Sequence, residues 1–158
     1  MAVDYFMKFD GAPGEVAELL FEKQIRVLSW GWTAHALSSV GSGGGSGSGK
    51  VDFDDFSFVS DFDSSSNRFF RHICKGTHVP GAILTARKAG GKAWPWLEMK
   101  FKGVFVTGVQ NQASWEIPAV SIAFSFEEVS IEYRIQKSDG TATSTGAITY
   151  NRKENKLS

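Results

Sequence analysis

The sequence predicts a mainly β, single-domain protein: a β-barrel of antiparallel strands with one α-helix at about residues 65–75 and a long extended Gly/Ser loop at about residues 38–49. Most of the chain alternates apolar and polar residues with the period of two that half-buried strands show. One stretch alone combines helical spacing with capping residues. A length of 158 residues with 42% hydrophobic and 13% aromatic content suits one core. We therefore expect residues 1–158 to form a single domain.

The first quarter of the chain predicts two strands. Residues 2–9 place four apolar side chains on one face, namely Val3, Tyr5, Met7 and Phe9. After a turn at 10–14, apolar residues at helical spacing in 15–24 permit a short helix. Residues 25–34 form a strand with unequal faces: one carries Leu28, Trp30, Trp32 and Ala34, and the other carries Val27, Ser29, Gly31 and Thr33. The first face belongs to a core or an interface, and the second meets solvent or another backbone.

A low-complexity segment follows, composed almost entirely of serine and glycine. It comprises Ser38, Ser39, Val40, Gly41, Ser42, Gly43, Gly44, Gly45, Ser46, Gly47, Ser48 and Gly49. As a linker between domains it would leave about 37 residues before it, too few for a core. We therefore interpret it as an extended, protruding loop.

The middle of the chain predicts a kinked strand and the helix. In residues 51–60 the apolar phase changes between Phe53 and Phe56, which indicates a β-bulge at 54–55. Residues 63–66 offer N-caps for a helix over 65–75, and Gly76 stands at its C′ position.

The second half predicts long antiparallel strands. Residues 78–110 read as a hairpin closed by Gly90-Gly91, which supplies the positive φ values of a tight turn. Residues 120–136 form a strand whose phase change places a bulge at 127–128. A turn at 138–140 and a short strand at 147–150 end the chain.

Composition limits the partners. Lys plus Arg and Asp plus Glu both total 17, so the formal net charge is zero and nucleic acid is not expected as a partner. No segment approaches the roughly 20 apolar residues that span a bilayer, and the start lacks the apolar run of a secretory signal. We expect a cytoplasmic protein with no membrane partner. Cys74 is the only cysteine, so no internal disulfide can form.

Two patterns imitate ligand sites. Gly44 and Gly49-Lys50 have the spacing of a phosphate-binding loop, but Val51 has no hydroxyl for Mg²⁺ and a strand follows instead of a helix. His72, Cys74 and His78 are close in sequence, but residues two apart on a helix point in different directions. We therefore predict no cofactor and no metal.

The sequence gives little support for a catalytic site or for an aromatic platform on which sugars or bases stack. The carboxylate pairs 54–55, 61/63 and 127–128 favour solvated faces or bulge rims, because adjacent strand residues point to opposite faces. We predict no enzymatic activity. Trp94, Trp96 and Trp115 lie beside loops without a basic groove, which favours packing in a core or a subunit interface.

Ordered motifs along almost the whole chain resemble one family. They are Met1 to Phe6, Gly14-Glu15, VLSWGW at 27–32, the glycine run ending in Lys50-Val51, FSF at 56–58, GTHVP at 76–80, LTARKAGG at 84–91, Trp96-Leu97, Val104 to Val106, Phe124 to Tyr133, QKSDG at 136–140 and Asn155-Lys156. In this order they resemble the Hcp family, the hemolysin-coregulated tube proteins of bacterial type VI secretion systems. Gly31 departs from the family pattern, which often has serine there.

The resemblance implies a structural protein whose hexameric rings stack into a tube and carry effectors in the lumen during contraction-driven secretion. It implies effector proteins, sheath and spike as further partners, and export from the bacterial cytoplasm without a signal peptide. Residues 38–49 become candidates for ring stacking, and the region 15–24 is expected to be an irregular connection. Lumen or cargo-facing candidates are Ser29, Gly31, Thr33 and Ser114. Subunit-interface candidates are Trp30, Trp32, Trp94, Trp96 and Trp115.

Two alternatives remain at this level. One is a monomeric β-barrel that binds a small ligand or a sugar. The other is a phage-type tail tube protein, which shares the ring architecture.

Overall fold

The computed structural model describes residues 2–38, 48–88, 94–113 and 116–158. Its elements are β1 (Val3–Phe9), a 3₁₀ turn η1 (Leu19–Phe21), β2 (Ile25–Gly31), β3 (Ala34–Ser38), β4 (Ser48–Phe53), β5 (Phe56–Asp61), α1 (Ser66–Lys75), β6 (His78–Lys88), β7 (Pro95–Gln112), β8 (Ala119–Ser125), β9 (Glu128–Gln136), β10 (Ala142–Asn151) and β11 (Lys156–Leu157). Strands dominate, and α1 is the one α-helix of the described residues. The predicted fold class is confirmed.

Six strands close into an antiparallel barrel. Their order is β7, β6, β1, β2, β5 and β8, and β8 pairs again with β7. The predicted central hairpin is confirmed as the pair β6–β7; its turn at 90–91 lies outside the described residues. Closure removes the open edges that make isolated sheets prone to association.

One edge of β7 serves two partners. Residues 97–102 pair with β9, and residues 105–112 pair with β8. The change occurs at Gly103, whose φ is +61° and where an added Cβ would lie 2.7 Å from Glu127 side-chain atoms. The Glu127 N–H donates to the carbonyls of Lys102 (2.9 Å) and Gly103 (3.2 Å). The bulge expected at 127–128 is therefore the point where the chain leaves the barrel.

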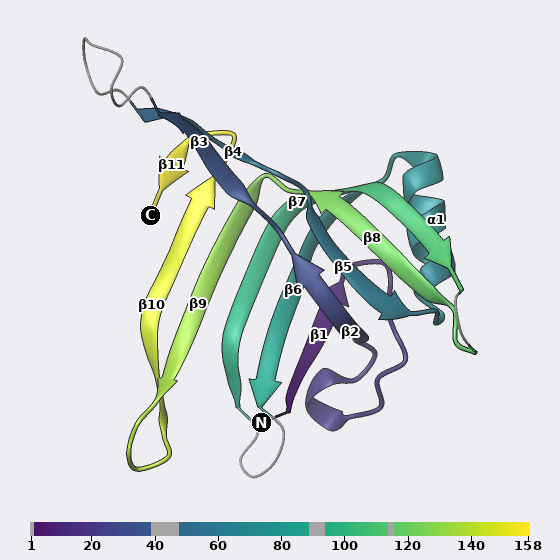
Figure 1. The fold of residues 1–158 in the computed structure, drawn as a ribbon, viewed down its shortest axis with the longest axis horizontal. Helices are drawn as coiled ribbons and strands as arrows, with labels where there is room; N and C mark the ends of the chain where they lie inside the picture. The colour runs from purple at the N-terminus through teal and green to yellow at the C-terminus, as the bar shows by residue number, and fades with distance from the viewer. Residues whose placement is uncertain (1, 39–47, 89–93, 114–115) are drawn as a thin grey trace.

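Beyond this point, β9, β10 and β11 form a small sheet that we call the wing. It continues the barrel sheet outward from the first part of β7 (Figure 1). The last long strand is β10 (Ala142–Asn151), which is longer than the predicted 147–150 because it pairs with nearly all of β9.

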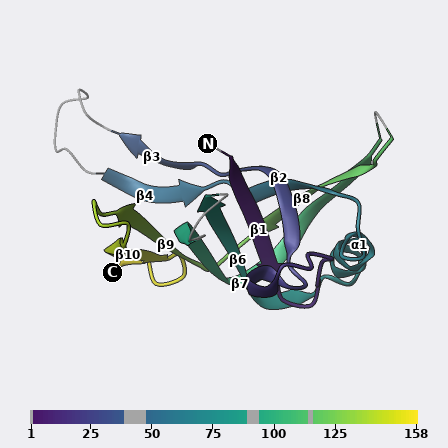
Figure 2. The same ribbon diagram turned by 90° about the horizontal axis from the view of Figure 1, so that it is seen from below.

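A second projection is the hairpin β3–β4, which we call the arm. It forms its own two-stranded sheet and points away from the barrel on the same side as the wing (Figures 1 and 2). The bulge expected at 54–55 is the break between the arm strand β4 and the barrel strand β5.

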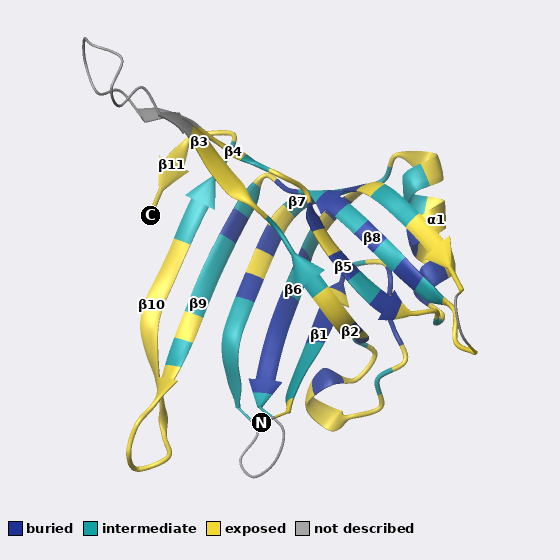
Figure 3. Ribbon diagram, viewed as in Figure 1, coloured by how far each residue is buried: buried dark blue, intermediate teal, exposed yellow. Residues whose placement is uncertain are grey.

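Aromatic rings fill the barrel. Phe56, Phe101 and Phe124 are each almost fully buried, and their centroids lie 4.9 to 5.1 Å apart. Such interlocked rings make a close-packed core. Buried residues alternate with exposed or partly buried residues along β5 and with partly buried residues along β8, so one face of each strand lies outside the core (Figure 3).

The helix α1 closes the barrel through Phe69, which is fully buried and packs edge-on against Phe9 and Phe58. Its start is fixed by Asp63, whose carboxylate accepts from the Ser65 N–H at 2.8 Å. Its end is Gly76 at φ +63°, the left-handed C-cap that the sequence predicts.

Residues 15–24 hold only the turn η1, because backbone hydrogen bonds such as Lys23 N to the Val16 carbonyl (2.8 Å) close the segment into an irregular loop. The irregular connection that the resemblance implies is confirmed, and the short helix that the residue spacing permits is not formed. One expectation for the next strand is corrected. Val27, expected on the small-residue face, lies in the core at 4% exposure, and Leu28 is 51% exposed. A register shift between Val27 and Ser29 in the β2–β5 pair reverses the phase there.

Candidate functional site

Trp30 at the end of β2 and Trp32 just after it lie where the barrel joins the arm. Trp30 stacks on Phe56 with centroids 5.9 Å apart, and Trp32 stacks on Phe53 of β4 at 5.6 Å. Both tryptophans are partly buried against the core. Within this protomer they support the root of the arm, and their role as interface residues stays a prediction.

The arm is also tied to the wing. Phe53 lies 5.3 Å from Tyr150 of β10, centroid to centroid, and 5.9 Å from Phe126. The Arg152 guanidinium lies over both phenylalanine rings and donates to the Phe126 carbonyl at 3.0 Å. This cluster holds the two projections at a fixed place on the barrel.

The arm itself is regular where it is described. Its strands pair from Ala34 with Phe53 out to Ser38 with Ser48. The expected loop therefore begins as a β-hairpin, and pairing starts at Ser48 although Val51 was the predicted strand start. Residues 39–47 of the stacking candidates lie outside the described residues.

Ser29, Gly31 and Thr33 lie together on the outer surface of the β2 segment. Ser29 and Thr33 are exposed, and an added Cβ at Gly31 would meet no atom of the described residues within 4 Å. The fourth lumen candidate, Ser114, lies outside the described residues, as does Trp115.

The strip of small residues on β2 continues across three more strands, a feature that the sequence does not predict. Gly31 pairs with Ser57, Ser57 with Ala123 and Ala123 with Gly108; the next row joins Ser29, Val59, Ser121 and Gln110. These eight residues are exposed or partly exposed, and we call them the smooth face. None of them is charged. The signal was present as the small residues that alternate with Phe56, Phe58, Ile122 and Phe124.

Trp94 and Trp96 flank Pro95, the first residue of β7. Lys88 places its ammonium 5.8 Å from the Trp94 ring centroid. Trp96 meets Tyr133 of the wing edge-on at 6.0 Å, and its indole Nε1 is buried without an acceptor among the described residues.

The supposed metal and acid–base groups are dispersed. His72 packs beside Gly11, Cys74 is exposed, and the described residues contain no group of three His, Cys, Asp or Glu side chains placed to hold a metal. Asp55 accepts from the Thr107 hydroxyl at 2.6 Å, and Glu128 pairs with Lys102 at 3.3 Å. Neighbouring carboxylates thus have separate partners.

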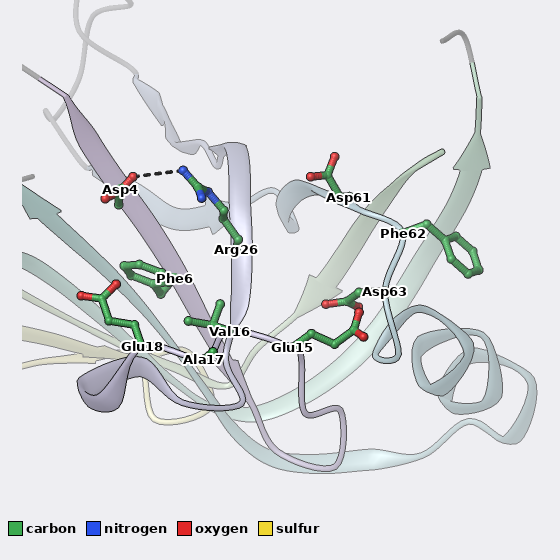
Figure 4. A pocket seen from close by; sticks show the side chains of 10 residues that line it. All are labelled: Asp4, Phe6, Glu15, Val16, Ala17, Glu18, Arg26, Asp61, Phe62 and Asp63. Atoms are coloured by element: carbon green, nitrogen blue, oxygen red, sulfur yellow. Dashed lines mark hydrogen bonds and ion pairs between the residues drawn. The ribbon is translucent and has the colours of Figure 1, made fainter. Parts of the chain in front are cut away.

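A surface cavity of about 450 Å³ lies between β1, β2 and the segments around Glu15 and Phe62 (Figure 4). Its lining contains carboxylates from Asp4, Glu15, Glu18, Asp61 and Asp63, and Arg26 is the one cation among the described residues that line it. Arg26 lies 3.4 Å from Asp4. Asp4 also pairs with the buried Arg87 at 3.2 Å, and Arg87 pairs with Glu18 as well.

Known proteins share this architecture. The family described as "Type VI secretion system effector, Hcp" matches residues 6–133. Protein hcp1 of Pseudomonas aeruginosa is 35% identical over 153 residues, which cover 95% of this chain and 94% of that protein. The chain belongs to the Hcp family of type VI secretion systems.

Solved Hcp structures agree with this fold. Hcp1 from Salmonella typhimurium is 30% identical, with a TM-score of 0.81 and complete coverage of both chains. A structure described as a type six secretion system protein is 25% identical with a TM-score of 0.92, covering 99% of this chain and 100% of that one. A type VI secretion system effector from Yersinia pestis is 26% identical with a TM-score of 0.74, over 94% and 99%. Among the described residues of this Hcp protein, no helix has the length and hydropathy needed to cross a membrane.

Proposed function

We propose that this Hcp protein is the structural tube component of a type VI secretion system, in which six copies form a ring, rings stack into a tube, and effectors travel in the lumen during contraction-driven secretion. The observation that carries the proposal is membership of the Hcp family over nearly the whole chain. Sheath and spike components are the expected partners of the assembled tube, and export follows assembly in the cytoplasm.

The smooth face supports a lumen-facing role. A lumen wall along which different cargo proteins pass should carry few charges, because a charge on the wall binds cargo of opposite charge and repels cargo of like charge. Its rows of Gly, Ser, Ala, Val and Gln meet this requirement on four adjacent strands. The lumen candidates Ser29 and Gly31 form one edge of it.

The arm supports the stacking role proposed for residues 38–49. It is anchored by the aromatic cluster at its root and reaches away from the barrel (Figure 1). A projecting hairpin buries little of its own surface, so its contacts come from a neighbouring ring, for example by strand addition. Phenylalanine rings fill the barrel interior, so it does not support the alternative of a barrel that binds a small ligand inside.

Electron microscopy combined with an effector-export assay tests the proposal. Gly31→Trp places a large side chain in open space, so rings should form as in the parent. The ratio of effector to Hcp protein outside the cells should fall, because six tryptophan side chains on the smooth face would narrow the lumen. Lys153→Trp, on the exposed C-terminal segment, is the matched control and should export effectors normally. Failure of the parent to form rings contradicts the tube role, and unchanged export by Gly31→Trp rings contradicts the lumen assignment.

A further inference from the structure

The two faces of the wing differ in chemistry. The outer face of β9 and of the part of β7 that pairs with it carries paired charges: Lys100 with Glu98 at 3.0 Å, Lys102 with Glu128 at 3.3 Å, and Arg134 with Glu132 at 3.2 Å. These pairs are typical of a surface that remains in water. The inner face continues the core side of the barrel, since Ile131 is opposite Met99 and Val129 is opposite Phe101.

The inner face loses its cover with distance from the barrel. Along β9 the exposed fraction rises from 3% at Val129 to 47% at Tyr133 and 53% at Ile135. On the neighbouring strands, Ile148 is 63% exposed and Leu157 is 68% exposed. We call these four uncovered residues, Tyr133, Ile135, Ile148 and Leu157, the wing patch. The strand register puts them on one face, since Ile131 is opposite Ile148 and Leu157 is opposite Tyr150. Exposed apolar residues that share a face and that no described segment covers mark a contact site.

A second apolar patch lies at the opposite end of the protomer. Phe62 is 41% exposed, Phe70 on α1 is 57% exposed and Ile117 is 64% exposed. The Phe62 N–H donates to the Pro118 carbonyl at 2.8 Å, which joins two of these segments. We call these three residues the end patch. The wing and α1 lie on opposite sides of the barrel in both views (Figures 1 and 2).

The charges beside the two patches are complementary. Glu15 and Asp63, in the cavity that Phe62 borders, accept from the consecutive N–H groups of Ser64 (3.3 Å) and Ser65 (2.8 Å). Neither carboxylate has a cationic side chain within ion-pair distance among the described residues, although both lie in the same cavity wall (Figure 4). Two neighbouring carboxylates without a cation favour a positively charged partner.

The wing provides such a cation. Lys137 follows Ile135 of the wing patch by two residues, is exposed, and forms no ion pair among the described residues. The nearby Asp139 is engaged inside its own turn, where the Thr141 hydroxyl (2.6 Å) and backbone N–H (2.9 Å) donate to it and lower its pKa. The ammonium of Lys137 is therefore the group at this tip that is free to pair.

We propose that the wing patch of one copy packs on the end patch of the next copy, with Lys137 entering the acidic cavity beside Glu15 and Asp63. The contact joins two different surfaces on opposite sides of one chain, so it is heterologous and closes into a ring when the rotation permits. This inference rests on the proposed ring and names the surfaces that build it.

A charge exchange tests the contact. Lys137→Glu and Glu15→Lys each place like charges opposite one another, so each should raise the concentration at which half of the rings dissociate by about tenfold or more, measured by mass photometry across a dilution series. The double variant should recover most of the parent value. Lys8→Glu is the matched control, because Lys8 lies on the barrel strand β1 outside both patches and is also an exposed lysine without an ion pair among the described residues, and it should leave the midpoint unchanged.

The apolar part of the contact has its own variant. Ile135→Glu should dissociate rings while the protomer keeps its melting temperature, because this side chain is already half exposed. Leu19→Glu, at a position that is 86% exposed and outside both patches, should keep the ring. If the parent forms rings while Ile135→Glu and the single charge variants form them equally well, the inference fails and the ring proposal stands. A parent protein that never forms rings overturns both.

Discussion

Replacing the buried Arg87 should destabilise the protomer far more than replacing its exposed neighbour Arg26. The Arg87 side chain is 9% exposed, its Nη2 lies 3.2 Å from Asp4, and it also pairs with Glu18. Its guanidinium lies 5.1 and 5.2 Å from the ring centroids of Phe6 and Phe21. Arg87 thus connects β1, β6 and the segment around η1.

The magnitude follows from these contacts. Arg87→Lys keeps a positive charge for Asp4 but loses the second carboxylate partner, Glu18. It also loses the planar contact of the guanidinium with the Phe6 and Phe21 rings, and each of these two contacts is worth about 0.5 to 2 kcal/mol. We expect a loss of about 2 kcal/mol. Arg87→Ala removes the cation from a largely buried pair, which costs about 3 to 5 kcal/mol in a dry interior. The partial exposure of Asp4 (22%) and Glu18 (45%) reduces this to about 3 kcal/mol.

The assay is urea unfolding at a protein concentration where the variants and the parent share one assembly state, since association adds to apparent stability. Arg26→Lys is the control. Arg26 is 68% exposed and shares Asp4 at 3.4 Å, so the change should cost less than about 0.5 kcal/mol. If Arg87→Lys lowers the free energy of unfolding no more than Arg26→Lys does, the contacts of the guanidinium with the Phe6 and Phe21 rings and with Glu18 contribute nothing measurable. The reasoning is then wrong.

Three further predictions concern the branch point, the cysteine and the loop. Gly103→Ala should lower the free energy of unfolding in urea by about 1 to 2 kcal/mol, because the position has a positive φ. Any further loss comes from the 2.7 Å approach of the added Cβ to Glu127, so it should be smaller in a Glu127→Ala background. Equal losses in both backgrounds would exclude that clash as a cause. Cys74→Ser, or a strong chelator, should leave assembly unchanged by light scattering, and dissolution of the ring by either would show that the thiol or a metal matters. Shortening residues 38–49 to a minimal turn should leave the melting temperature of the protomer nearly unchanged, because loop-closure entropy varies slowly with length, but should reduce the number of tubes in electron micrographs; a variant that stacks like the parent would refute the stacking role.

The parts of the fold that local sequence signals determine were predictable. The period-two alternation identified the strands, and the phase changes at 54–55 and 127–128 marked real breaks between strands. Asp63 and Gly76 bounded the helix because capping requires particular residue types at fixed offsets. These signals act over a few residues, so one sequence is sufficient to read them.

The features that depend on distant pairing were not predictable in the same way. The division of the β7 edge between β8 and β9 depends on Gly103 facing Glu127, 24 positions later in the chain, and no local pattern announces it. The register shift after Val27 reverses the inward face of β2 without a glycine or proline at the shift. The smooth face depends on the register of four neighbouring strands, so the sequence predicts only Ser29 and Gly31 at its edge.

The candidate interface residues show the same limit. The sequence places Trp30 and Trp32 on a face that belongs to a core or to an interface, and it cannot separate the two. Within the protomer they pack on Phe56 and Phe53 and support the arm, and their interface role stays a prediction. The uncovered apolar residues lie on the wing, where Ile135 and Ile148 have ordinary alternating positions in their strands. Alternation indicates that a face is apolar, but only the tertiary structure shows whether another part of the same chain covers it.

Native mass spectrometry at micromolar protein concentration and moderate salt is the most direct test of the central claim that this Hcp protein assembles into a closed ring. The predicted result is one dominant species with the mass of six protomers of 17.3 kDa. A dominant species with the mass of a single protomer under these conditions would contradict the proposed tube function.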